Sequence, residues 1–213
     1  MVKLSNSNGN SPRTEDEKLE IIKKATEAYG NYLHALGFDW ENDPNMRDTP
    51  KRVAKMHVRE TMKGCFDEEP IITDFENVNH YGGMVFQGNI DVKSLCSHHH
   101  MGFFGKAHVA YVANNTDVGV IIGLSKLNRI VDYFARRPQV QENLTVQIAE
   151  YVDKLIPNNL GVAVMIEANH TCVSARGVQN ESTMMTSELT GAFKDNPATR
   201  QEFYEFINRL SKK

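Results

Sequence analysis

The chain has 213 residues, 40% hydrophobic and 24% charged, with a formal net charge of -3. Such a composition excludes the strongly basic surface on which general nucleic-acid binding depends, and no apolar run approaches the roughly 18 residues of a membrane span. The segment Met1–Glu20 is polar where a signal peptide would have an apolar core. We therefore expect a cytoplasmic protein with no nucleic-acid or membrane partner.

The composition divides the chain into three parts. Residues 1–13 are rich in Ser, Asn and Gly and predict a disordered polar tail. Residues 14–64 predict an N-terminal helical region, whose second helix has Thr49 as its expected N-cap and Pro50 as its first residue. Residues 65–213 contain both strand and helix patterns and predict the main domain.

In that domain the predicted order is strand, strand, helix, helix, strand, strand, helix. Grouped strands around a helix pair favour an α+β fold, with helices on one face of a sheet, over an alternating Rossmann pattern. The first helix has Ser125 as its expected N-cap, and the apolar run 118–122 either extends the sheet or lies beneath that helix. The predicted ranges are 84–95, 106–112, 125–137, 140–155, 162–166, 182–190 and 197–210.

Two short motifs suggest a metal site. Cys96 and the histidine run that follows it give C-x-x-H spacing, which lets one turn direct a thiolate and an imidazole to the same point. Cys172, after a strongly patterned strand, would complete a set of two cysteines and one histidine. Three protein ligands leave the open position typical of catalytic zinc. Spacing alone does not decide which histidine of residues 98–100 is the ligand. It also leaves open that the residues bind no metal.

Other residues fit proton transfer and anion binding. His98 and His170 flank the proposed ligands, and histidine titrates near neutral pH. Ser125, Lys126 and Arg129 open a predicted helix, where two cations are unfavourable unless an anion is bound. A solvated helix start is the alternative. Arg176 and Arg52 are further candidates for binding phosphate. Glu142 either binds the edge of a guanine base or merely stabilises a helix start. His57, His80 and His108 are expected to serve packing or to be exposed to solvent.

Longer motifs extend over the chain from about Glu15 to its end. They are Asp48–Met56, Cys96–His99, Gly105–Tyr111, Gly123–Arg129, Arg137–Glu142, His170–Cys172 and Ala175–Gly177. In this order they resemble the type I GTP cyclohydrolases. The chain departs from the usual family pattern at Ser97, where Glu is usual, at His100, where an apolar residue is usual, and at Gly102, where Pro is common.

The resemblance implies the tunnelling fold for residues 65–213, with subunit sheets joined into barrels in a toroidal homodecamer and active sites between subunits. It also implies zinc (Zn2+) bound by Cys96, His99 and Cys172, with His98 and His170 handling protons. Glu142, with Gln141 beside it, would hold the guanine. The triphosphate would be held by Ser125, Lys126, Arg129, Arg176 and Arg52.

The implied reaction is hydrolysis of GTP to 7,8-dihydroneopterin triphosphate and formate, the first step towards tetrahydrofolate, pterins or deazaguanines. The triphosphate is an anchor and is not cleaved, which agrees with the lack of a Walker-type P-loop. A non-catalytic nucleotide-binding relative would need to have lost a ligand or a proton-transfer histidine. A nitrile reductase of the same fold needs no pair of zinc thiolates, and a zinc nucleobase deaminase would carry the H-x-E and P-C-x-x-C motifs, which are absent.

Overall fold

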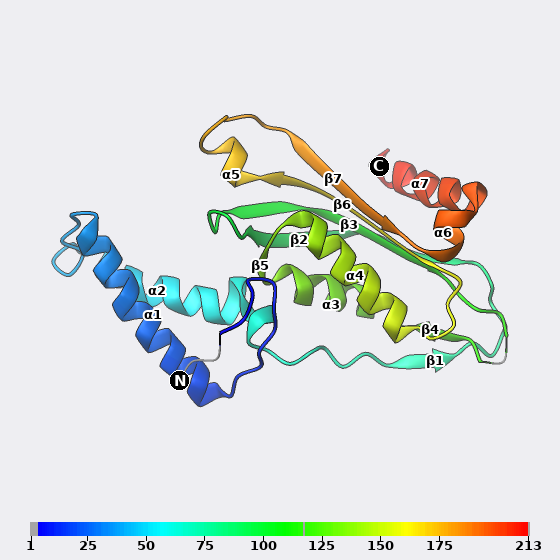
Figure 1. Cartoon of the computed structure of the whole chain (residues 1–213), viewed down its shortest axis with the longest axis horizontal. Coiled ribbons are helices and arrows are strands. Elements are labelled where there is room, and N and C mark those ends of the chain that lie inside the picture. The colour runs from blue at the N-terminus through cyan, green and yellow to red at the C-terminus, as the bar shows by residue number, and fades with distance from the viewer. Residues whose placement is uncertain (1–3, 117, 213) are drawn as a thin grey trace. The chain divides into compact units, whose positions relative to one another are not determined.

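The computed structural model describes residues 4–116 and 118–212 (Figure 1). It divides into two compact units, Met1–Glu69 and Pro70–Lys213. The division falls a few residues after position 65, where the sequence predicts the main domain to begin. Among the described residues, no helix combines the length and the apolar character needed to cross a membrane.

The first unit is helical. Helix α1 (Glu15–Ala35) begins with a capping box, in which Thr14 and Glu17 each bind the other's main-chain N–H through their side chains. Helix α2 (Thr49–Met56) has Asp48 as its N-cap, so the predicted cap Thr49 is wrong by one residue and is instead the first helical residue. A π-helical turn (His57–Thr61) and a 3-10 turn (Lys63–Cys65) follow. Three residues of the predicted tail, Asn10, Ser11 and Arg13, make hydrogen bonds to main-chain carbonyls of residues 64–67.

A five-stranded sheet forms the centre of the second unit. Its order is β5-β2-β3-β6-β7, and all neighbours are antiparallel except β2 and β5. A separate small sheet pairs β1 (Asp74–Glu76) with β4 (Val120–Ile122), so the apolar run before α3 does not extend the main sheet. The main strands are β2 (Met84–Cys96), β3 (Gly102–Val112), β5 (Pro138–Gln139), β6 (Val162–His170) and β7 (Thr183–Leu189).

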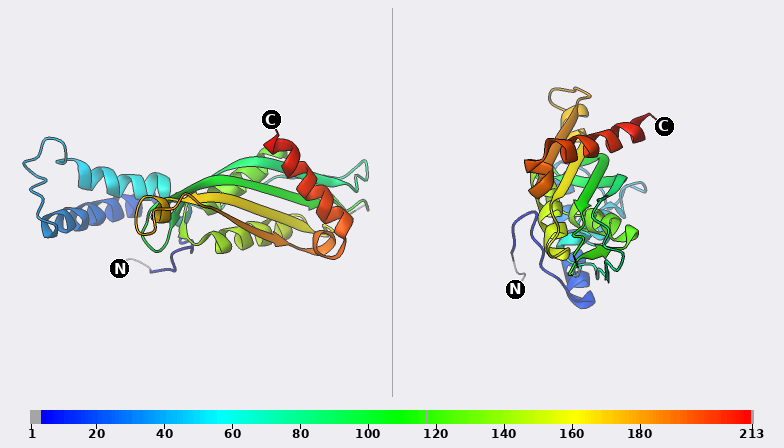
Figure 2. Two further views of the ribbon diagram at one scale, coloured as in Figure 1. Left: turned by 90° about the horizontal axis from the view of Figure 1, so that it is seen from above. Right: turned by 90° about the vertical axis from the view of Figure 1, so that its right-hand side faces the viewer.

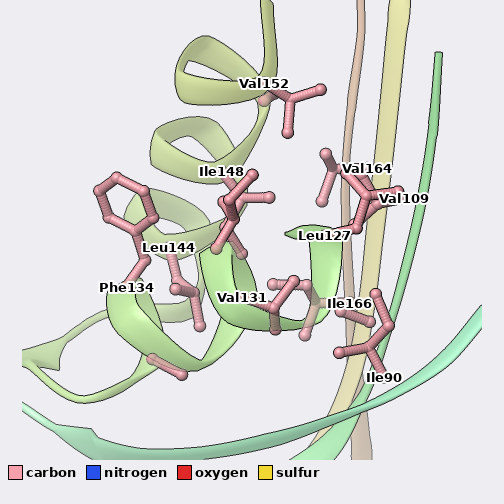
Figure 3. Close-up of a cluster of buried hydrophobic side chains, with 14 of the residues drawn as sticks. Ile90, Val109, Leu127, Val131, Phe134, Leu144, Ile148, Val152, Val164 and Ile166 are labelled. Carbon is pink, nitrogen blue, oxygen red and sulfur yellow. The ribbon is translucent and has the colours of Figure 1, made fainter. Parts of the chain in front are cut away.

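Helices cover both faces of this sheet. The predicted pair, α3 (Leu124–Ala135) and α4 (Gln141–Leu155), packs its apolar stripes on one face, as the side chains in Figure 3 illustrate. The sequence predicted helices on one face, but α6 (Gly191–Asp195) and α7 (Pro197–Ser211) pack on the opposite face (Figure 2). Alternation along β3 explains this arrangement: Val109 contacts the first cluster and Ala110 the second.

The strand register brings three chain segments together at one end of the sheet. Cys96 ends β2, Gly102 begins β3 opposite Leu95, and Phe103 of β3 pairs with His170 at the end of β6. The short helix α5 (Thr171–Ser174) follows at once. Residues more than seventy positions apart in the sequence therefore meet at this end.

Candidate functional site

A tight turn after β2 presents the three histidines. The Cys96 N–H donates to the Met101 carbonyl and the His100 N–H donates to the Cys96 carbonyl, each at 2.8 Å. His100 has a φ of 53°, a left-handed conformation that a non-glycine residue adopts mainly in turns. The turn leaves Cys96 buried and the side chains of His98, His99 and His100 exposed.

The two predicted cysteines lie together. The Thr171 hydroxyl donates to the Gly102 carbonyl at 2.6 Å and ties the start of α5 to the start of β3. Ligand atoms of Cys96, His170 and Cys172 all lie within 4.8 Å of one another. Burial and then the neighbouring Cys96 thiol raise the pKa of the Cys172 thiol above its ordinary value.

This donor set fits a zinc ion. Zinc–sulfur bonds of about 2.3 Å in a tetrahedron place two sulfur ligands about 3.8 Å apart. The two sulfurs therefore need to approach each other by no more than about 1 Å to bind one ion. Thiolate and imidazole donors also select zinc over the oxygen-preferring cations.

His170 is held on two sides. Its ring stacks on Phe103 with centroids 4.5 Å apart and an interplanar angle of 9°. Its Nε2 lies 2.9 Å from Oε1 of Gln141. Burial lowers the pKa of His170, and the negative charge of Glu142 opposes that shift. His170 is therefore favoured in its neutral form.

His98 and His99 have different environments. His98 Nδ1 lies 3.7 Å from the Cys96 sulfur, whereas His99 Nε2 lies 2.7 Å from an Arg176 guanidinium nitrogen. His99, which the resemblance assigns to the metal, is thus outside the group formed by the cysteines and His170. The structure pairs His99 with one of the predicted phosphate-binding residues.

A cavity of about 300 Å³ opens beside the cysteines. Its volume is at the lower end of the range for small-molecule sites. Glu142, in the first turn of α4, is exposed at this cavity, whereas Gln141 is fully buried in its wall. The residues that line it are Cys96, His98, Val140, Gln141, Glu142, His170, Cys172, Val173, Ser182 and Met184.

The predicted anion residues lie at the start of α3. The N-cap is Gly123, with no side-chain cap, so the predicted cap Ser125 is wrong and lies within the first turn. Ser125 and Arg129 are exposed and Lys126 is half-buried. These three residues are not part of the lining of the cavity beside the cysteines. Arg52 lies in the first unit, exposed on α2, where it pairs with Asp48.

Sequence reasoning missed several residues around the cysteines. Phe103 was assigned no role, although its position opposite His170 follows once β3 and β6 are aligned. Ser182 and Met184 reach the cavity from β7 and the segment before it. Their sequence carries no motif that points to a site, because only the β6–β7 pairing brings them there.

A larger cavity, of about 450 Å³, lies between β2 and α3. Its charges are neutralised locally: Asp132 accepts from Arg136 at 2.9 Å, and Asp91 accepts from Lys106 at 2.6 Å. It has no cysteine or histidine in its lining. The chemistry of metal binding and proton transfer therefore points to the smaller cavity.

Comparison with known proteins agrees with the motifs over most of the chain. Residues 25–208 match the family model described as GTP cyclohydrolase I. The GTP cyclohydrolase 1 of Flavobacterium johnsoniae is 45% identical over 196 residues, which are 91% of this chain and 83% of the relative. Those of a Sulfurihydrogenibium species and of Porphyromonas gingivalis are 46% and 43% identical, over 89% and 92% of this chain and 96% and 98% of the relatives. The chain belongs to the GTP cyclohydrolase I family.

Proposed function

We propose that this protein hydrolyses GTP to 7,8-dihydroneopterin triphosphate and formate with the help of a zinc ion. The observation that carries the proposal is the meeting of Cys96, His170 and Cys172 at a cavity that Glu142 also lines. Membership of the GTP cyclohydrolase I family supplies the reaction type. A zinc-stabilised scaffold would not need a cavity beside its metal donors.

Zinc would be held by Cys96, Cys172 and the His99 imidazole. His99 is exposed on a turn and can leave Arg176, whereas His170 is held by stacking on Phe103 and by a hydrogen bond to Gln141. His170 is therefore better suited to a fixed proton-transfer role than to a ligand role. When bound, zinc supplies Lewis acidity that lowers the pKa of a water molecule towards neutrality.

Protons would be moved by His98 and His170. Because burial lowers the pKa of His170, its neutral ring is ready to accept a proton near neutral pH. His98 is exposed and lines the same cavity, close to the Cys96 sulfur. Two imidazoles on different segments would allow one group to accept and the other to donate during ring opening.

Guanine would bind at Glu142. Its exposed carboxylate lines the cavity and offers two acceptor oxygens, which match the N1–H and exocyclic amine of a guanine edge. The partner residue named by the resemblance, Gln141, has its side-chain nitrogen within 3.1 Å of two main-chain carbonyls and a threonine hydroxyl. Its buried amide is thus already engaged with the protein.

The triphosphate would bind to basic residues, none of which lines the cavity beside the cysteines in a single copy of the second unit. We propose that copies of the chain assemble, as a homodecamer by resemblance, and that a neighbouring copy completes each site. In support, the strand β7 and most of β2 lie at open edges of the main sheet, where another sheet can pair. The proposed triphosphate residues are Ser125, Lys126, Arg129, Arg176 and Arg52.

The direct test follows the purified, zinc-loaded protein with GTP. We expect formate and a pterin, detected by its ultraviolet absorbance, to form in equal amounts. A metal chelator should abolish the formation of both products, and added zinc should restore it. GTP binding without formate release would instead indicate a non-catalytic nucleotide-binding protein. With full zinc occupancy verified, the absence of both products would overturn the proposed activity.

A further inference from the structure

Gln141 occupies a buried position between a helix and two strands. It begins α4, is 0% exposed and lies beside His170. Its side-chain nitrogen lies 3.1 Å from each of three acceptors, the Ile166 carbonyl of β6, the Met184 carbonyl of β7 and the Thr186 hydroxyl. Its side-chain oxygen lies 2.9 Å from Nε2 of His170.

These partners fix the orientation of the amide. Main-chain carbonyls only accept hydrogen bonds, so the side chain must turn its NH2 group towards them. The reverse orientation would place an oxygen against two carbonyl oxygens in a buried site, which is unfavourable because buried polar groups would be left unsatisfied. The Gln141 oxygen must then face His170.

The amide orientation in turn fixes the histidine. An amide oxygen has no hydrogen to give, so the short contact requires a hydrogen on Nε2 of His170. In a neutral ring the lone pair is then on Nδ1. Phe103 fixes the plane of the ring. Gln141 selects one of the two ring orientations in that plane, because a 180° flip about the Cβ–Cγ bond would move Nε2 away and leave the Gln141 oxygen without a donor.

We propose that Gln141 is a positioning residue that holds His170 in the tautomer with hydrogen on Nε2, and that it does not bind the guanine. The inference rests on the proposed function, in which His170 exchanges protons, and it assigns that exchange to Nδ1. Buried hydrogen bonds support the arrangement: the Thr145 hydroxyl donates to the main-chain carbonyl of Gln141 at 2.9 Å and lies 2.6 Å from the Thr186 hydroxyl. Partner groups that orient metal-bound histidines commonly affect activity by about 10- to 100-fold, and we expect an effect of the same order for His170.

The first test observes the tautomer directly. Nitrogen NMR of the zinc-loaded protein with labelled histidine, at mildly alkaline pH and without GTP, reports which ring nitrogen carries hydrogen. The His170 signals are assigned as those that disappear in His170→Ala. We expect hydrogen on Nε2; hydrogen on Nδ1, or rapid averaging between the two forms, would overturn the proposal.

The second test compares two variants. Gln141→Met keeps the length of the side chain and removes both hydrogen-bonding groups, whereas Thr186→Val removes one partner of the amide and leaves the bond to His170. We expect Gln141→Met to lower kcat by about 10- to 100-fold with KM for GTP and zinc content nearly unchanged. Thr186→Val should lower kcat far less, because the Ile166 and Met184 carbonyls still orient the amide.

A raised KM at unchanged kcat in Gln141→Met would mean that the residue binds guanine, and would overturn the proposal. Equal losses of kcat in Gln141→Met and Thr186→Val would also overturn it, because loosened packing would then explain both. If the unsubstituted enzyme shows no turnover, the proposed function is overturned instead. The NMR spectrum would still determine the tautomer of His170.

Discussion

His99 and Arg176 are hydrogen-bonded to each other, with His99 Nε2 2.7 Å from a guanidinium nitrogen. Guanidinium only donates, so this nitrogen of His99 uses its lone pair to accept. Zinc binding through the same nitrogen requires the pair to separate. The contact therefore links the proposed metal ligand with a proposed triphosphate ligand.

We expect Arg176→Ala to raise KM for GTP while leaving zinc affinity undiminished. The KM effect should be about 10- to 100-fold, as for other hydrogen bonds to charged groups. Zinc affinity should not fall, because the variant removes a competitor for the His99 lone pair. Steady-state kinetics and competition with a zinc chelator measure the two effects. Lys154→Ala, an exposed cation late in α4, controls for net charge; loss of zinc from Arg176→Ala would contradict the prediction.

The imidazole ligand can be identified by comparing two histidine variants. We expect His99→Ala to lose zinc and activity together, and His170→Ala to retain zinc while losing turnover by about 10²–10⁴-fold, the usual contribution of a proton-transfer group. Metal content after dialysis measures occupancy, and formate release measures turnover.

The thiols provide the matched pair for this experiment. Cys172→Ser should lose zinc, whereas Cys65→Ser, in the first unit, should keep it. A His170→Ala protein without zinc beside a zinc-replete His99→Ala protein would make His170 the third ligand, as its distance from the cysteines alone would suggest.

Periodic patterns in the sequence predicted the main elements of the fold, and their failures have local causes. Strands β2, β3 and β6 and helices α3, α4 and α7 carry alternating or helical apolar patterns, and each was predicted. Strand β1 was missed because all three of its residues are exposed. Ser125 was a poor prediction of the cap because Gly123 starts the helix with main-chain groups and has no side chain to signal it.

The site was predicted unevenly for a similar reason. Cys96 ends β2, and Cys172 lies two residues beyond the end of β6, at the same end of the sheet, so both could be expected from the sequence. The positions of His99 and His170 depend on the left-handed turn at His100 and on side-chain torsions, which spacing does not encode. Gln141 and Glu142 were expected to act together, yet adjacent helical residues point about 100° apart, and one is buried while the other is exposed.

Lys126 should contribute to binding only when phosphates are present. We expect Lys126→Ala to weaken GTP binding by about tenfold or more and to leave guanosine binding unchanged, because a cation at a helix start contacts the anion and not the base. Equilibrium titration with both ligands measures the difference, and Lys154→Ala is again the charge control. Equal losses for GTP and guanosine would show that the substitution disturbs the site as a whole.

His108 should make the stability of the protein depend on pH. The residue is 1% exposed on β3 and stacks on Phe86. Its Nδ1 accepts from the Asn89 N–H at 3.4 Å, and its buried Nε2 has no hydrogen-bond partner among the described residues. Burial lowers the pKa of His108, the Glu167 carboxylate 4.0 Å away raises it in part, and Lys106 lowers it.

The pKa of His108 is lower in the folded than in the unfolded state. As the pH falls below about 6.5, the unfolded state therefore binds more protons than the folded state. The free energy of unfolding should therefore be highest above that pH and decline as the pH falls towards the depressed folded pKa. Urea unfolding at a fixed protein concentration, between about pH 8 and pH 5.5, measures the slope. In His108→Gln we expect lower stability at pH 8, from lost packing, but a shallower decline towards acid. Glu167→Gln should steepen the decline, because it removes the charge that favours protonation; parallel curves for all three proteins would show that His108 does not contribute.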